Sequence, residues 1–366
     1  MAEILGLGMS HYPLMARPTG QKSIAFRLVD RPDLPDTAKD PGNWPEAMRR
    51  ELADDQGEAY QRAHREAFGA ECRKIRETLD EFEPDAVLIW GDDQYENFKE
   101  DIVPAFCLLA YDDMDVYPYR PVVDPIGSSS STFEHVSANA WGEPEDTRLN
   151  LQGNRDLAKA IARGLIAEKV DIAYAYQPLH FPSLSHAFLN TVLFLDWDRD
   201  RGWPYPIIPF QINCYGERVI VNKGFISPVG KINLPDAELD PPGPTPERCM
   251  EVGAAVVRVL SQRPERVALI ASSSWSHAFL TPKHDFVYPD VENDRAMYDA
   301  LGRGDFDFWR SITNEQVYDR GQQEMRNWWA LMGAMEALGR ATPSYHAFIE
   351  SYSQNSNKCF VVYDAN

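Results

Sequence analysis

Three of the eight histidines in this 366-residue chain directly follow a serine, and all three are candidates for chemistry. They are His11, His186 and His277. His11 and His277 follow short apolar runs, 4–9 and 267–271, which are typical of buried parallel strands. In open α/β sheets, ligands bind outside the carboxyl ends of the strands, so we expect these histidines to converge on one site.

A polar segment after the apolar run 86–90 is the second candidate. It places Asp92, Asp93, Gln94 and Glu96 within five consecutive positions. Carboxylate and amide oxygens so close to a strand end could bind a metal ion or hydrogen-bond a substrate. The two aspartates could equally cap whatever follows, which is a common role of aspartate. The sequence leaves all three uses open.

Two further histidines lie close to the Ser-His pairs. His180 precedes His186 in the segment HFPSLSH, and His284 follows His277 in HAFLTPKH. Clustering at strand ends favours a functional role for at least two of these four side chains. The remaining histidines are expected to be structural: His64, His135 and His346.

Composition and missing motifs narrow the function classes. The five cysteines form no Cys-x-x-Cys pair, which argues against a thiolate zinc site or a disulfide framework. A metal ion would therefore need imidazole, carboxylate or amide ligands, which suit iron, manganese or zinc. The net charge of −20 argues against nucleic acid and anionic membranes as partners. The N-terminus has no leader pattern and no apolar run could span a membrane, so we expect a cytoplasmic protein.

Strand-length apolar runs alternate with helical patterns along the chain, which predicts an α/β fold. We expect one large domain over 1–366, with a mostly parallel or mixed sheet and helices on both faces. The expected strands are 4–8, 86–90, 103–110, 170–176, 205–212, 267–271 and 359–363. The expected helices are 45–83, 151–169, 246–262 (with Thr245 as N-cap) and 323–338. The long irregular stretch 112–150 is expected to form a flap or an oligomer contact.

Several segments of the sequence are distinctive. They are GLGMSHYP, GDDQYENF, SHAFLNTVLFLD followed by WPYPIIPFQINCYG, LIASSSWSH, and EMRNWWALMGAM followed by KCFVVYD. In this order, and over nearly the whole chain, they resemble the class III extradiol ring-cleavage dioxygenases. The resemblance is strongest to catalytic subunits of the protocatechuate 4,5-dioxygenase type and to the gallate and 3-O-methylgallate enzymes.

The resemblance implies a mononuclear Fe(II) held by two histidines and a glutamate, with a further histidine as acid/base. His11 matches the first iron-binding histidine, and His186 matches the acid/base histidine. His277 matches the histidine of the family's Gly-Leu-Ser-His motif. His186, His277 and the clustered His180 are therefore the expected catalytic residues.

Two ligand positions depart from the family pattern. Gln94 stands where the family has its second ligand histidine, and the position of the glutamate falls near His284. His11 and His284 could then supply both imidazoles. Glu96 or Asp93 would supply the carboxylate, and Gln94 a weak amide ligand. The expected metal residues are thus His11, Gln94, Glu96 and His284.

The expected function is extradiol cleavage of a catecholic or gallate-like substrate by Fe(II) and O2, in a homodimeric enzyme. Two alternatives follow from the altered ligand positions. One is a Zn(II)- or Mn(II)-dependent hydrolase or C–C lyase that acts on a related compound. The other is a non-catalytic relative that binds a small aromatic molecule or a protein partner.

Overall fold

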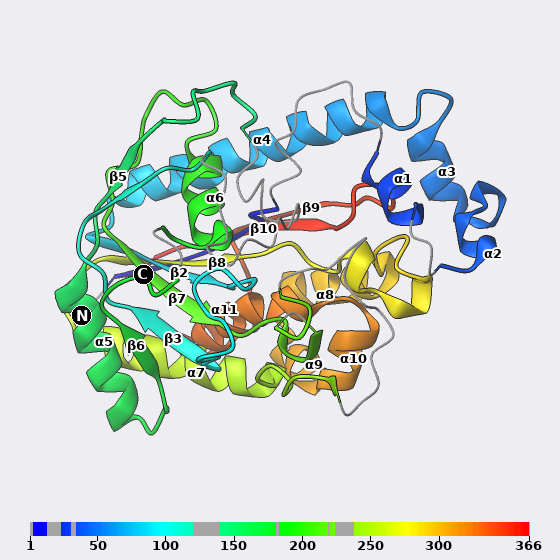
Figure 1. Cartoon of the computed structure of the whole chain (residues 1–366). Helices are drawn as coiled ribbons and strands as arrows, with labels where there is room; N and C mark the ends of the chain where they lie inside the picture. The colour runs from blue at the N-terminus through cyan, green and yellow to red at the C-terminus, as the bar shows by residue number, and fades with distance from the viewer. Residues whose placement is uncertain are drawn as a thin grey trace.

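The computed structural model describes residues 3–12, 23–30, 34–119, 139–180, 183–218, 220–223 and 238–365 (Figure 1). Its centre is an eight-stranded sheet with the strand order β6-β3-β7-β2-β8-β1-β10-β9. The strands are β1 (Ile4–Met9), β2 (Ala86–Gly91), β3 (Phe106–Leu109), β6 (Ala173–Ala175), β7 (Ile207–Ile212), β8 (Val267–Ser272), β9 (Tyr345–Ile349) and β10 (Lys358–Tyr363).

The four central strands, β1, β8, β2 and β7, run parallel to one another. β10 and β3 flank them in antiparallel orientation, so the sheet is mixed. Every residue of the four central strands is buried, as expected for apolar strands covered on both faces. Because they are parallel and in register, their carboxyl ends meet at one edge, just before His11 and Asp92.

Helices cover both faces of the sheet, which confirms the predicted fold class. α4 (Glu58–Phe82) and α6 (His186–Leu195) lie on one face; α5 (Arg155–Ala167), α7 (Pro246–Leu260) and α11 (Arg326–Ala337) lie on the other (Figure 1). α7 and α11 pack backbone against backbone, because a Cβ added at Gly253 would lie 1.8 Å from the Ala330 carbonyl oxygen. This contact fixes α11 beneath the strand ends.

The remaining elements surround this core. α1 (Ile24–Val29), α2 (Asp36–Lys39) and α3 (Glu46–Leu52) form a small apolar cluster of their own with Val287. α8 (Val291–Arg303), α9 (Phe306–Ser311) and α10 (Asn314–Asp319) precede α11. β4 (Met114–Val116) and β5 (Leu149–Leu151) pair as a separate two-stranded sheet. A membrane-crossing helix is absent from the described part of the chain, where none is long and apolar enough.

Most predicted elements are present, with shifted boundaries. The expected helix 45–83 is two helices, α3 and α4, which are separated at Gly57, where φ is +85°. The hydroxyl of Thr245 accepts the Arg248 amide at 3.1 Å, which confirms it as the N-cap of α7. Within 112–150 the structure describes β4 and β5; residues 120–138, with His135, lie outside the described residues.

Candidate metal centre

Three buried side chains from three elements meet at the carboxyl edge of the sheet. His11 follows β1, Asp92 follows β2, and His186 is the first residue of α6. One possible ligand atom of each lies within 4.8 Å of the other two. Two hydrogen bonds attach α6 here. The N-cap Ser185 donates through Oγ to the Asp92 carbonyl (2.8 Å), and Asn190 Nδ2 donates to the His11 carbonyl (3.1 Å).

The His11 imidazole is oriented by its backbone partner. Its Nδ1 lies 2.9 Å from the Ser272 carbonyl oxygen, which can only accept, so Nδ1 carries the proton. Burial and the nearby His186 hold the pKa of His11 well below its usual value, so the ring is neutral. The lone pair of Nε2 then faces Asp92 Oδ1, 3.7 Å away. A neutral imidazole with one nitrogen anchored in this way is the form that binds metal ions.

A carboxylate orients His186 in a similar manner. Glu96 accepts the His186 backbone amide at 2.7 Å, and its second oxygen lies 3.1 Å from His186 Nδ1. Burial disfavours the imidazolium, but the charge and hydrogen bond of Glu96 outweigh it and raise the pKa of His186 to about 9. Nδ1 is occupied by Glu96, so Nε2 is the nitrogen that a metal ion could bind once its proton is lost. Carboxylate–histidine pairs of this kind commonly support metal ligands.

Asp92 has one satisfied oxygen and one unsatisfied oxygen. Asn327 Nδ2 donates to Oδ1 at 3.1 Å, whereas the buried Oδ2 has no hydrogen-bond partner among the described residues. Burial raises the pKa of Asp92 to about 6. An unpaired buried carboxylate oxygen is costly, and a cation beside it would remove that cost. The donor set therefore fits a metal ion.

Glu324 adds a second buried carboxylate next to this group. Its Oε2 lies 3.7 Å from His11 Nε2, its Oε1 lies 3.4 Å from His277 Nε2, and the Tyr215 hydroxyl donates to it. Burial, reinforced by the charge of Asp92, raises the pKa of Glu324 well above its usual value. Burial and the Lys358 ammonium lower the pKa of His277 to about 3. Both shifts favour the uncharged forms of these two side chains.

The polar segment after β2 divides into separate roles. Asp93 accepts the backbone amides of Glu96 and Asn97, both at 2.9 Å, so the capping role suits Asp93. Gln94 lies beside the group, where its amide oxygen is 3.4 Å from the Tyr215 hydroxyl. The sequence offered Asp93, Gln94 and Glu96 as ligands. In the structure it is Asp92 that joins His11 and His186.

Two of the expected site residues lie elsewhere. His284 ends a single 3₁₀ turn and stacks on Tyr288, with ring centroids 4.1 Å apart and Nδ1 3.2 Å from the Tyr288 carbonyl oxygen. The turn directs this imidazole toward its own loop rather than toward His11. His180 is partly exposed and pairs with Asp101 at 2.7 Å. Neither histidine belongs to the metal-ligating group of the described residues.

Comparisons with known proteins show what the chain is similar to. Residues 220–356 match the family model described as the catalytic LigB subunit of aromatic ring-opening dioxygenase. Similar curated proteins are named 2,3-dihydroxyphenylpropionate/2,3-dihydroxicinnamic acid 1,2-dioxygenase. The chain is 24% identical to the Paraburkholderia phymatum protein, over 76% of this chain and 83% of that protein. The Burkholderia vietnamiensis protein gives the same identity and coverage, and the Photorhabdus laumondii protein is 24% identical over 64% of this chain and 55% of its own length.

These relatives bear the name of a dihydroxyphenylpropionate enzyme rather than of a protocatechuate or gallate enzyme. The broader resemblance predicted from the motifs is confirmed. The chain is related to the class III extradiol dioxygenases and is an enzyme of the aromatic ring-cleaving kind.

Proposed function

We propose that the chain is a non-haem Fe(II) dioxygenase that opens the ring of a catecholic substrate outside the diol. The observation that carries this proposal is the grouping of His11, Asp92 and His186 within 4.8 Å. Two histidines and one carboxylate, with the remaining positions open, are the ligand set of non-haem iron oxygenases. The unpaired Oδ2 of Asp92 supports a cation at this point.

The proposed ligand set moves His186 from the acid/base role that the resemblance implies to a metal-binding role. Glu96 and the Ser272 carbonyl hold the two imidazoles, each through Nδ1. Bound iron would supply coordination positions for the diol oxygens and for O2, and an electron path between them. Orientation of the ligands, and exclusion of water from a buried site, come from the protein.

We assign proton transfer to His277. Its Nε2 lies 3.4 Å from Glu324 Oε1, so a proton taken from a substrate hydroxyl could be shared with that carboxylate and returned to an oxygen atom later in the reaction. Glu324 contacts both His277 and His11, so it can keep that proton within the site. Tyr215 holds Glu324 in place through its hydroxyl.

The test is oxygen uptake by anaerobically Fe(II)-loaded protein after addition of catechol, protocatechuate, gallate or 2,3-dihydroxyphenylpropionate and then air. We expect uptake together with a ring-opened product from at least one substrate. The His11→Ala variant should lose bound iron and activity together. Absence of uptake with all four substrates, despite stoichiometric iron, would contradict the proposal.

Mn(II) is the second candidate for the metal, because carboxylate oxygens suit manganese and Glu324 places an additional carboxylate beside His11. Metal analysis of purified protein separates the two. Iron supports the dioxygenase as proposed, whereas zinc or manganese without iron would favour the hydrolase or C–C lyase alternative.

A further inference from the structure

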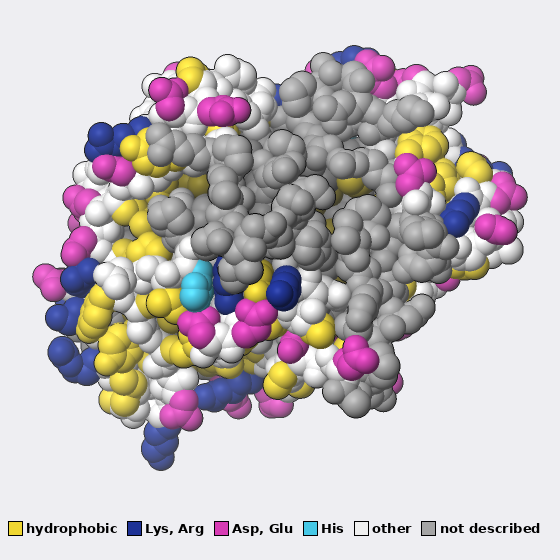
Figure 2. All heavy atoms as spheres, viewed as in Figure 1, with side chains coloured by type: hydrophobic (Ala, Val, Ile, Leu, Met, Phe, Trp, Pro, Cys, Tyr) yellow, Lys and Arg dark blue, Asp and Glu magenta, His cyan; other side chains and the backbone are white. Residues whose placement is uncertain are grey.

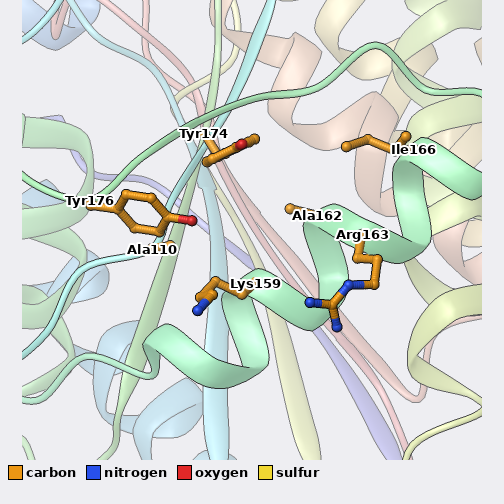
Figure 3. A pocket seen from close by; sticks show the side chains of 7 residues that line it. All are labelled: Ala110, Lys159, Ala162, Arg163, Ile166, Tyr174 and Tyr176. Atoms are coloured by element: carbon orange, nitrogen blue, oxygen red, sulfur yellow. The ribbon is translucent and has the colours of Figure 1, made fainter.

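A pocket of about 230 Å³ lies between α5 and β6, on a part of the molecule that shares no residue with the metal centre (Figure 3). α5 supplies Lys159, Arg163 and Ile166, and β6 with the residue after it supplies Tyr174 and Tyr176. In the close view the two tyrosine rings lie across the opening from the two cationic side chains (Figure 3). β6 is the edge strand of the sheet that the described residues form, and among them no further strand covers it.

The basic side chains of this pocket belong to a stripe on α5. Arg155, Lys159 and Arg163 recur every four residues, so they share one helix face. Arg155 is already paired, 2.9 Å from Asp112, and it donates to the Tyr176 carbonyl at 2.9 Å. Lys159 and Arg163 have no hydrogen bond or ion pair with any described residue. In a chain of net charge −20, these two unpaired cations create a local positive potential that attracts anions.

The opposite wall of the pocket is aromatic and exposed. Tyr174 is 52% exposed and Tyr176 is 45% exposed, with their ring centroids 5.6 Å apart. Ile166, at 56%, extends the apolar surface. In the space-filling view, exposed hydrophobic side chains and Lys and Arg side chains lie together at the lower left, where Figure 1 shows α5 and β6 (Figure 2). Exposed aromatic clusters with a polar rim are typical of binding sites.

We propose that this pocket binds a small aromatic carboxylate at a site independent of the metal centre. The aromatic ring packs against Tyr174 and Tyr176, and the carboxylate lies between Lys159 and Arg163. A guanidinium can bind a carboxylate through two parallel hydrogen bonds, which gives direction as well as charge. The volume is below the roughly 300–1,000 Å³ of drug-sized sites, which favours a single ring.

The test measures binding of 4-hydroxybenzoate to the metal-free full-length protein by calorimetry. This probe has one hydroxyl group, so it lacks the diol that the metal centre would chelate. We expect saturable binding, and a loss of about 10–100-fold in the Lys159→Ala/Arg163→Ala double variant, as for hydrogen bonds to charged groups. The charge-matched Arg50→Ala/Arg62→Ala variant, which alters two exposed arginines on α3 and α4, should bind normally.

Two further probes, one uncharged and one without an aromatic ring, test whether the pocket recognises both the charge and the ring of the ligand. 4-Hydroxybenzyl alcohol lacks the charge and cyclohexanecarboxylate lacks the aromatic ring, so both should bind more weakly than 4-hydroxybenzoate. Equal binding to wild-type protein and to the Lys159→Ala/Arg163→Ala variant would overturn the proposal, as would no saturable binding at all. Binding that is abolished by His277→Ala would assign the ligand to the metal centre instead.

Discussion

Replacing Glu96 with glutamine distinguishes two roles of this residue. The sequence offered Glu96 as a metal ligand, whereas the structure places its carboxylate on the backbone amide and Nδ1 of His186. If Glu96 only orients His186, the Glu96→Gln variant keeps all three proposed ligands. What changes is the proton on His186, and therefore how metal affinity depends on pH.

The magnitude follows from the pKa of His186, which Glu96 helps to raise to about 9. At pH 7 a metal ion must displace this proton, which costs about 2.7 kcal/mol, or roughly 100-fold in apparent affinity. Wild-type affinity should therefore rise as the pH increases from 7 to 9. In the variant, burial dominates and the imidazole is neutral, so affinity should be nearly constant over this range.

Loss of the carboxylate also weakens the ligand by about 10–100-fold, the usual cost of removing such a partner. At pH 7 the variant gains affinity because no proton has to be displaced from His186, and it loses affinity because the ligand is weaker, so the two effects largely cancel. At pH 9 only the loss remains, and the variant should bind iron about 10–100-fold more weakly than wild type. The assay is anaerobic Fe(II) titration at both pH values, with Glu143→Gln as control, because Glu143 contacts Arg199 and Tyr119 instead. A loss of binding at every pH would mean that Glu96 itself holds the metal and would refute this reasoning.

Three further perturbations test other parts of the account. His277→Gln should lower kcat by about 10²–10⁴-fold while iron content stays at the wild-type level; loss of iron would instead make His277 a ligand. Asp294→Ala removes the acceptor of four buried donors, which belong to Ser276 (amide and hydroxyl), Gln322 and Asn357. The substitution should reduce the free energy of unfolding, measured by urea denaturation, by about 3–5 kcal/mol. A loss under about 1 kcal/mol would contradict this network. Gly253→Ala should reduce the free energy of unfolding by about 1–3 kcal/mol in the same assay, because the new Cβ meets the backbone of Ala330. Gly302→Ala is the control: its Cβ meets only the His346 ring, so its effect should be close to zero. Equal effects of the two substitutions would refute the α7–α11 contact.

The central sheet was predictable because buried parallel strands are continuous apolar runs. β1, β2, β7, β8 and β10 begin and end within about two residues of the predicted runs. β4, β5 and β9 were missed, since they are short or only half buried and carry no such run. The break between α3 and α4 lies in the polar stretch 53–57, which the expected single helix 45–83 did not separate from the charged residues on either side.

The site was predictable only in part. Convergence of His11 and His186 follows from strand ends, and the structure brings them together. Asp92, not Asp93, lies beside His11 and His186 because of the way the chain turns after β2. Two adjacent aspartates in the sequence do not indicate which of them faces the site. Glu324 reaches His11 from just before α11, and no spacing in the sequence signals this contact. His284 was counted from a family position, but a 3₁₀ turn directs it onto Tyr288.

Anomalous diffraction at the iron edge, from crystals of anaerobically Fe(II)-loaded protein, tests the central claim most directly. We expect one strong peak, bonded to Nε2 of His11, Nε2 of His186 and a carboxylate oxygen of Asp92, with Glu96 still on His186 Nδ1. A peak coordinated by Gln94 and Glu96 without Asp92, or no peak among these residues in fully loaded protein, would contradict it.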